Sequence, residues 1–143
     1  MRRLVLFLVA WLLAEPGHAD SPVVLEGEWK LTGMIYHGHL IPPLNPNLNL
    51  RWTFFANGTD RLYWDRTGES GFCERFAHYT IQDNLLHEKV FAVNSRNNPD
   101  CAKDPDMQMD RKTANPVEFQ QNQILLHLQM GDEELIYVLE EVP

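Results

Sequence analysis

Residues 48–66 read LNLRWTFFANGTDRLYWDR, and this stretch decides the fold. Apolar and polar residues alternate on both sides of Asn57-Gly58, which is the pattern of two half-buried β-strands joined by a tight turn. A three-residue loop over 56–58, with Gly58 left-handed, places Trp52 opposite Leu62, whereas a two-residue turn would place it opposite Tyr63. We predict the first register, because a slip by one residue would turn the apolar set of the second strand outward.

The chain outside this hairpin keeps the same alternation, broken by Gly, Pro, Asn and Asp, and has almost no helical periodicity after residue 19. This pattern predicts an all-β fold, a single up-and-down antiparallel β-barrel of about 8–9 strands, which removes sheet edges by closing. The Pro-rich stretch 41–46 and the stretch 95–106 are expected to be loops. Strands are expected at 28–37, 48–56, 59–66, 72–82, 85–94, 107–113, 116–121, 124–130 and 134–142.

A second hairpin turns at Asp83-Asn84. With a three-residue loop over 82–84, His78 would face Glu88, and a His–carboxylate pair can serve as a general acid and base. Such pairs are more often surface contacts between strands. The chain has no recognisable nucleophile motif and no Gly-rich phosphate loop, so the sequence leans away from an enzyme and indicates no cofactor.

The first 19 residues have the three parts of a cleaved signal peptide. Arg2-Arg3 is followed by an unbroken apolar run over 4–14, and small residues precede the expected cleavage after Ala19. The run is shorter than the roughly 20 residues that span a bilayer, which disfavours a membrane anchor. We therefore predict a signal peptide at 1–19, one domain at 20–143, and a periplasmic or secreted location.

The charge balance narrows the expected partners. The chain has 12 Lys and Arg against 20 Asp and Glu, a formal net charge of −8, and losing residues 1–19 removes two Arg and one Glu, which makes it −9. An acidic surface without a basic cluster repels phosphate backbones and anionic membrane surfaces. Neither nucleic acid nor integral membrane association is expected.

Cys73 and Cys101 are the two cysteines of the chain. Two cysteines in an exported chain usually pair, because the compartment is oxidising. Closing a loop of about 28 residues stabilises a fold by roughly 3 kcal/mol in the chain-entropy treatment. Free thiols or metal ligands are the alternative, which no Cys-x-x-Cys spacing supports. The disulfide would tie the 95–106 loop to the strand at 72–82.

Four short motifs carry a resemblance to a known family. Gly27-Glu28-Trp29 at the entry to the first strand resembles the lipocalin and calycin barrels. Residues 54–59 (FFANGT) and 79–85 (YTIQDNL) are similar to two successive hairpins of small bacterial secreted lipocalin-like domains, and 131–137 (GDEELIY) resembles their closing hairpin. The resemblance spans 27–140 and implies a barrel that commonly encloses or approaches a small apolar ligand.

The alternating aromatic face is where the lining of a ligand cavity would begin, although an eight-strand barrel can also be filled by its own side chains. The candidate ligand-binding residues are Trp52, Phe54, Leu62, Trp64 and Tyr79. We predict an exported soluble binding protein for a small apolar or amphipathic ligand. The alternative is a filled barrel that binds or inhibits another exported protein through its loops. A pocket above about 300 Å³ would favour the ligand.

Two polar groups are weak metal candidates. His37 and His39 lie on the same side of an extended segment and could contribute to a divalent metal site, but no third ligand is visible. Asp104, Asp106 and Asp110 could hold Ca²⁺, but their order matches no EF-hand loop. Exposed histidines and a solvated acidic loop are the simpler interpretations, and no metal is expected.

Overall fold

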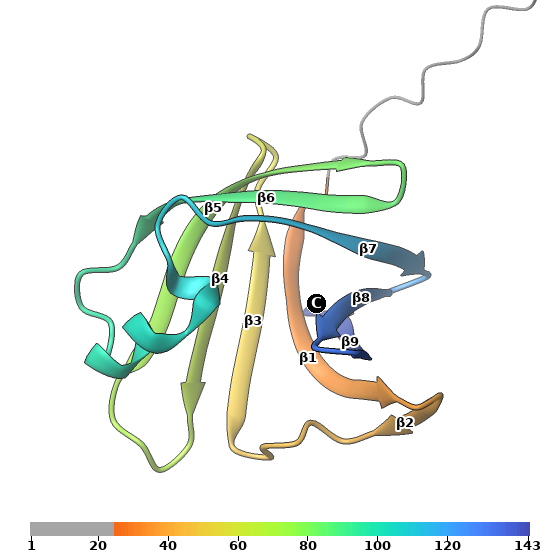
Figure 1. Cartoon of the computed structure of the whole chain (residues 1–143), viewed down its shortest axis with the longest axis horizontal. Coiled ribbons are helices and arrows are strands. Elements are labelled where there is room, and N and C mark those ends of the chain that lie inside the picture. Colours follow the sequence, from red (N-terminus) through yellow and green to blue (C-terminus); the bar gives the residue numbers. More distant parts are fainter. Residues whose placement is uncertain (1–24) are drawn as a thin grey trace, which may run out of the picture.

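The computed structural model describes residues 25–143, so the predicted signal peptide at 1–19 lies outside the described residues. Strands follow one another along the chain, with two short 3₁₀ helices between β6 and β7 (Figure 1). The elements are β1 (Gly27–Tyr36), β2 (His39–Ile41), β3 (Leu48–Phe54), β4 (Thr59–Arg66), β5 (Phe72–Gln82), β6 (Leu85–Val93), η1 (Pro99–Lys103), η2 (Pro105–Met107), β7 (Lys112–Gln120), β8 (Gln123–Met130) and β9 (Glu133–Glu141).

Eight of these strands form a closed antiparallel barrel. From β3 to β9 each strand pairs with the next, and β1 pairs with β3 on one side and with β9 on the other. A bulge between Leu31 and Gly33 lies in the pairing of β1 with β9. The short β2 folds back on the end of β1 and lies outside the barrel. The prediction of an all-β, up-and-down, lipocalin-like barrel is confirmed.

The hairpin of β3 and β4 has the predicted register. Trp52 lies opposite Leu62 and Leu50 opposite Trp64. The amide of Phe55 donates to the carbonyl of Thr59 over 2.9 Å, which leaves a three-residue loop, and Gly58 in that loop has a φ of 79°. A left-handed residue at this position is strained for a side chain with a Cβ, so glycine determines the turn and therefore the register.

The predicted register of the next hairpin is wrong. Gln82 pairs with Leu85, so the loop has two residues, Asp83 and Asn84, with φ values of 53° and 58°. Two consecutive left-handed residues make the primed turn that matches the twist of a hairpin, and Asp and Asn tolerate it. The change moves Glu88 opposite Tyr79 and into the barrel interior.

The predicted His78–Glu88 pair is therefore absent, and the predicted division of residues 107–121 is also wrong. His78 lies on the outer surface, where its ring stacks on Phe91 at 4.4 Å. In place of the strands expected at 107–113 and 116–121 there is a single strand, β7, which begins only at Lys112, since Met107 belongs to η2 and residues 108–111 to a loop. Pro116 does not interrupt β7, because it ends the pairing with β6, and the pairing with β8 begins at the next residue.

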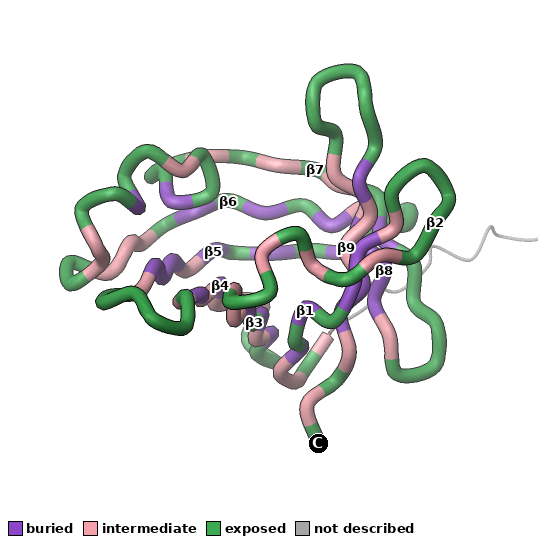
Figure 2. The backbone as a smooth tube through the Cα atoms, turned by 90° about the horizontal axis from the view of Figure 1, so that it is seen from below, coloured by how far each residue is buried: buried purple, intermediate pink, exposed green. Residues whose placement is uncertain are grey.

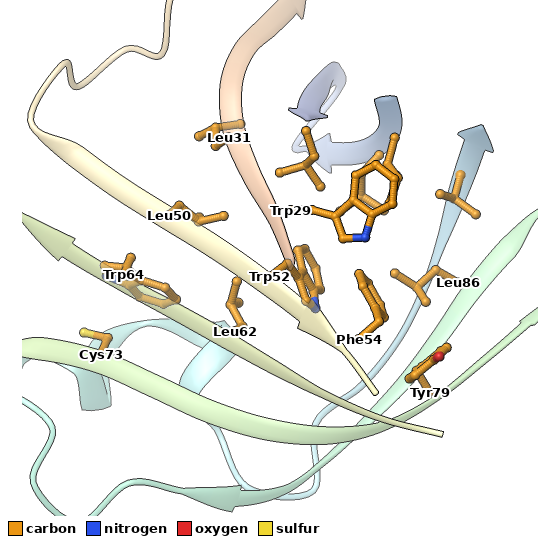
Figure 3. Packing of buried hydrophobic residues seen from close by; sticks show 14 of the residues in the cluster. Trp29, Leu31, Leu50, Trp52, Phe54, Leu62, Trp64, Cys73, Tyr79 and Leu86 are labelled. Carbon is orange, nitrogen blue, oxygen red and sulfur yellow. The ribbon is translucent and has the colours of Figure 1, made fainter. Parts of the chain in front are cut away.

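The side chains that point into the barrel form one apolar core. Buried residues alternate with intermediate ones along β4 and with exposed ones along the second half of β5 and most of β6, as Figure 2 shows. Trp52 and Phe54 stack at 5.8 Å, and Phe54 meets the edge of Tyr79 at 5.0 Å (Figure 3). Tight turns join the strands at this end of the barrel. Apart from the two-residue turn between β8 and β9, the connections at the opposite end are longer, and they include the segment 94–111 with η1 and η2.

Candidate functional site

A cavity of about 460 Å³ lies inside the barrel, toward the end that carries the long connections. Its apolar wall comes from inward-facing residues of β3, β4, β6, β8 and β9, and its polar part comes from β5, β6 and β7 and from η2. The principal apolar residues are Leu50, Trp52, Leu62, Trp64, Val90 and Tyr137. A mostly apolar space with a few convergent polar groups is the usual form of a small-molecule site.

Three of the five predicted ligand-binding residues line this cavity. Trp52, Leu62 and Trp64 belong to its wall. Phe54 and Tyr79 do not, because they pack against each other near the closed end. The hydroxyl of Tyr79 donates to the carbonyl of Leu25 over 2.6 Å, which holds the chain before β1 across that end. The structure therefore brings the cavity residues of β3 and β4 together and separates them from Tyr79.

Three charged side chains lie buried in the barrel as one network. Arg75 on β5 contacts Asp60 on β4 through one terminal nitrogen and donates to Glu88 Oε1 on β6 through the other, over 2.7 Å. Trp52 Nε1 donates to Asp60 Oδ1 over 3.0 Å, and the guanidinium lies 5.3 Å from the Trp52 ring centre. The exposed fraction of these three charged side chains is 0% to 4%. We call Asp60, Arg75 and Glu88 the buried triad.

The triad has one more carboxyl than guanidinium. Burial raises the pKa of Glu88 to about 8, with Arg75 opposing and Asp60 adding to the rise. Burial likewise raises the pKa of Asp60, against the opposing effect of Arg75. Burial alone would lower the pKa of Arg75, but Glu88 and Asp60 outweigh it and raise that pKa. With a pKa of about 8, Glu88 keeps a proton at neutral pH, and this proton offsets the excess carboxyl of the network.

Sequence reasoning missed the triad, although a signal was present. Asp60 has the same parity as Leu62 and Trp64, and Glu88 the same parity as Leu86 and Val90, so alternation places each carboxyl on the apolar face of its strand. Charged residues are seldom fully buried, so the sequence leads to no expectation of a buried Asp60, and it offers Glu88 only as a partner of His78. A carboxylate on the face that carries Trp52 and Trp64 is unusual, and this pattern in the sequence could have indicated Asp60 as a buried charge.

The segment 94–111 covers part of the cavity mouth. Asp104, Pro105 and Asp106 line the cavity, and Met107 is buried in the core. The segment is held by the Cys73–Cys101 disulfide, which confirms the predicted pairing, and by Asn97, whose side chain bonds both backbone groups of Glu74 at 2.8 and 2.9 Å. We call residues 94–111 the cap.

The disulfide is expected to stabilise both the fold and the cap. Replacing Cys73 and Cys101 together by Ser should lower the free energy of unfolding by about 3 kcal/mol, because the unfolded chain regains the freedom of a loop of 28 residues. Amide hydrogen exchange of the cap should rise more than that of β3, which the disulfide does not touch. A double variant that loses less than about 1 kcal/mol, with unchanged exchange in the cap, would show that the other cap contacts suffice.

The metal candidates are dispersed. His37 lies in a turn and faces Glu133 Oε1 at 3.3 Å, and His39 is exposed on β2. Asp104 caps η2 through its side chain, and Asp106 lies 3.6 Å from Arg111. Among residues 25–143, no three His, Cys, Asp or Glu side chains are grouped in a way that could hold a metal ion.

Comparison with known proteins supports the fold. A lipocalin-like protein from Bacteroides uniformis ATCC 8492 has a similar structure, with a TM-score of 0.57 and 14% sequence identity over 82% of this chain and 98% of that chain. The barrel is thus lipocalin-like. No known family profile matches the sequence, and no curated protein does. Within residues 25–143, none of the helices has the length and apolar character needed to cross a membrane.

Proposed function

We propose that this chain is an exported binding protein that holds a small apolar or amphipathic molecule in the barrel cavity. The cavity of about 460 Å³ carries the proposal, because it exceeds the roughly 300 Å³ at which small-molecule pockets begin. Its volume also argues against the alternative of a filled barrel that works only through its loops. The disulfide and the sequence of residues 1–19 support export, since disulfides persist in oxidising compartments.

The apolar body of the ligand would pack between Trp52, Trp64 and Val90, which removes it from water. The buried triad would face its polar group from the β5 and β6 side. The cap would lie over the bound molecule, since Pro105 belongs to the same lining. Binding in this arrangement is selective by shape and needs no covalent step.

Uptake of dansylamide, an uncharged fluorescent probe, tests the proposal. The purified chain should raise and blue-shift the probe's fluorescence with a Kd in the micromolar range, which corresponds to about −8 kcal/mol. Val90→Phe should weaken this uptake at least about tenfold, because the added ring occupies the cavity that Val90 lines. The matched control is His87→Phe, which adds the same ring on the outer face of β6 and should leave uptake unchanged.

Native mass spectrometry of freshly purified protein gives an independent readout of a retained small molecule. A wild-type chain that takes up no dansylamide and carries no retained molecule would contradict the proposal. Equal uptake by Val90→Phe and wild type would place the probe outside the cavity and would contradict the assigned site.

A further inference from the structure

Three Arg and three carboxyls line the cavity, and the buried Asp60 behind the lining adds a fourth carboxyl. Each of the three Arg already faces a carboxylate: Arg66 lies 3.9 Å from Glu69, Arg111 lies 3.6 Å from Asp106, and Arg75 holds Asp60 and Glu88. Asp104 is a further carboxyl in the lining. The terminal nitrogens of all three Arg therefore have carboxylate partners, whereas Nε of Arg75 and Nε of Arg111 have no hydrogen-bond partner among the described residues. With Asp60 included, the carboxyls of the lining and the triad outnumber the Arg by four to three.

Glu88 is the excess carboxyl that reaches the cavity. Asp60 is completely buried and does not belong to the lining, whereas Glu88 does. Glu88 Oε1 accepts the bond from Arg75, Glu88 Oε2 has Thr113 Oγ1 at 3.4 Å, a long contact, and the Asp60 carboxyl also faces Glu88. Glu88 Oε2 therefore has room for a stronger hydrogen-bond donor.

Aromatic faces surround the same space. Trp52, Trp64 and Tyr137 all line the cavity. The face of an aromatic ring attracts cations, and this attraction grows where water is excluded. The net charge of the whole chain, −8, would also increase the rate at which a cation arrives.

We propose that the cavity selects amphipathic amines, with the ammonium group of the ligand against Glu88 and its apolar body against Trp52 and Trp64. This inference rests on the proposed function and adds to it the charge of the ligand. An ammonium would supply the positive charge that the buried triad lacks, and its N–H groups would donate to Glu88 Oε2. A carboxylate ligand would add a negative charge where carboxyls are already in excess.

The titration of Glu88 agrees with this assignment. Burial raises the pKa of Glu88 to about 8, so without a ligand a proton compensates the excess carboxyl at neutral pH. An ammonium group carries the same charge as that proton and can replace it. The groups that face Glu88 are Arg75 from β5, Asp60 from β4 and Thr113 from β7.

Three probes with one body and different charges test the inference. Phenylbutylamine, phenylbutanol and phenylbutyrate share the ring and the chain but carry a cationic, a neutral and an anionic group. At pH 7 the full-length chain should bind the amine at least about tenfold more tightly than the alcohol, and the carboxylate most weakly, by isothermal titration and by quenching of Trp fluorescence. In Glu88→Gln the preference for the amine over the alcohol should fall below about threefold. The control is Glu118→Gln, whose side chain is exposed on β7, and this variant should keep the preference of the wild type.

The outcomes separate the two proposals. If the alcohol binds and the amine binds no more tightly, or if the carboxylate binds best, the charge assignment is overturned and the binding function stands. If none of the three binds and dansylamide is also excluded, both are overturned. The three probes on the wild-type chain test the charge preference of the cavity even if Glu88→Gln does not fold.

Discussion

Replacing Arg75 by Met should lower the free energy of unfolding at pH 7 by about 3–5 kcal/mol, the largest loss that we expect from a single substitution. The reason is that Arg75 compensates both Asp60 and Glu88, whose side chains are 0% and 4% exposed. Without the guanidinium, two carboxyl groups remain buried close together with no positive partner. Urea unfolding of the oxidised protein, followed by Trp fluorescence, measures the loss.

The loss should shrink as the pH falls, because both carboxyls can then take protons and become neutral. Arg51→Met is the control, since Arg51 pairs with Glu28 at the surface and such pairs contribute about 0–1 kcal/mol. Adding Asp60→Asn and Glu88→Gln to Arg75→Met should recover at least half of the loss. If Arg75→Met is no more costly than Arg51→Met, the triad has no structural role.

Glu88→Gln should remove a pH dependence from the stability of the protein. The pKa of Glu88 is about 8 in the folded state against an ordinary value of 4.5, so the folded state keeps a proton that the unfolded state releases between these values. The contribution of Glu88 to stability is therefore fully present below pH 4.5 and is lost as the pH rises toward 8. The expected slope is about −1.4 kcal/mol per pH unit in this window.

Unfolding curves collected from pH 5 to pH 8 test this prediction. The free energy of unfolding of Glu88→Gln, relative to that of the wild type, should increase by a few kcal/mol from pH 5 to pH 8, because the amide cannot release a proton. Glu69→Gln, an exposed carboxyl near the mouth, should run parallel to the wild type. Parallel curves for Glu88→Gln and wild type would mean that Glu88 is ionised throughout this window in the folded protein.

The ligand cavity requires apolar side chains and the buried triad requires charged ones, and both lie on the same strands. A ligand needs an apolar wall, which Trp52 and Trp64 provide, whereas the buried triad is stable only while Arg75 compensates the charge of its carboxyls. The residues that cost stability therefore lie beside the space that would hold a ligand. Buried charged groups with shifted pKa values are common at functional sites. We therefore look for the role of Glu88 in the cavity.

Local sequence accounts for much of the barrel. The alternation of Leu50, Trp52, Leu62 and Trp64 around Asn57-Gly58 predicts the hairpin and its register, because a glycine turn and an apolar face both act over a few residues. The same alternation predicts which of these side chains point inward. The second hairpin was predicted less well, since Asp83 and Asn84 allow two loop lengths and only the observed one turns Glu88 inward.

The sequence by itself determined most of the strand pattern, the up-and-down barrel class and the pairing of Cys73 with Cys101, because the alternation of side chains and the count of cysteines are visible without the fold. Only the tertiary structure decided that the cap covers the cavity mouth, that Phe54 lies outside the cavity, and that Asp60, Arg75 and Glu88 meet inside. The physical reason is that the triad joins three neighbouring strands. Its burial and charge balance exist only once the barrel has closed around it and excluded water.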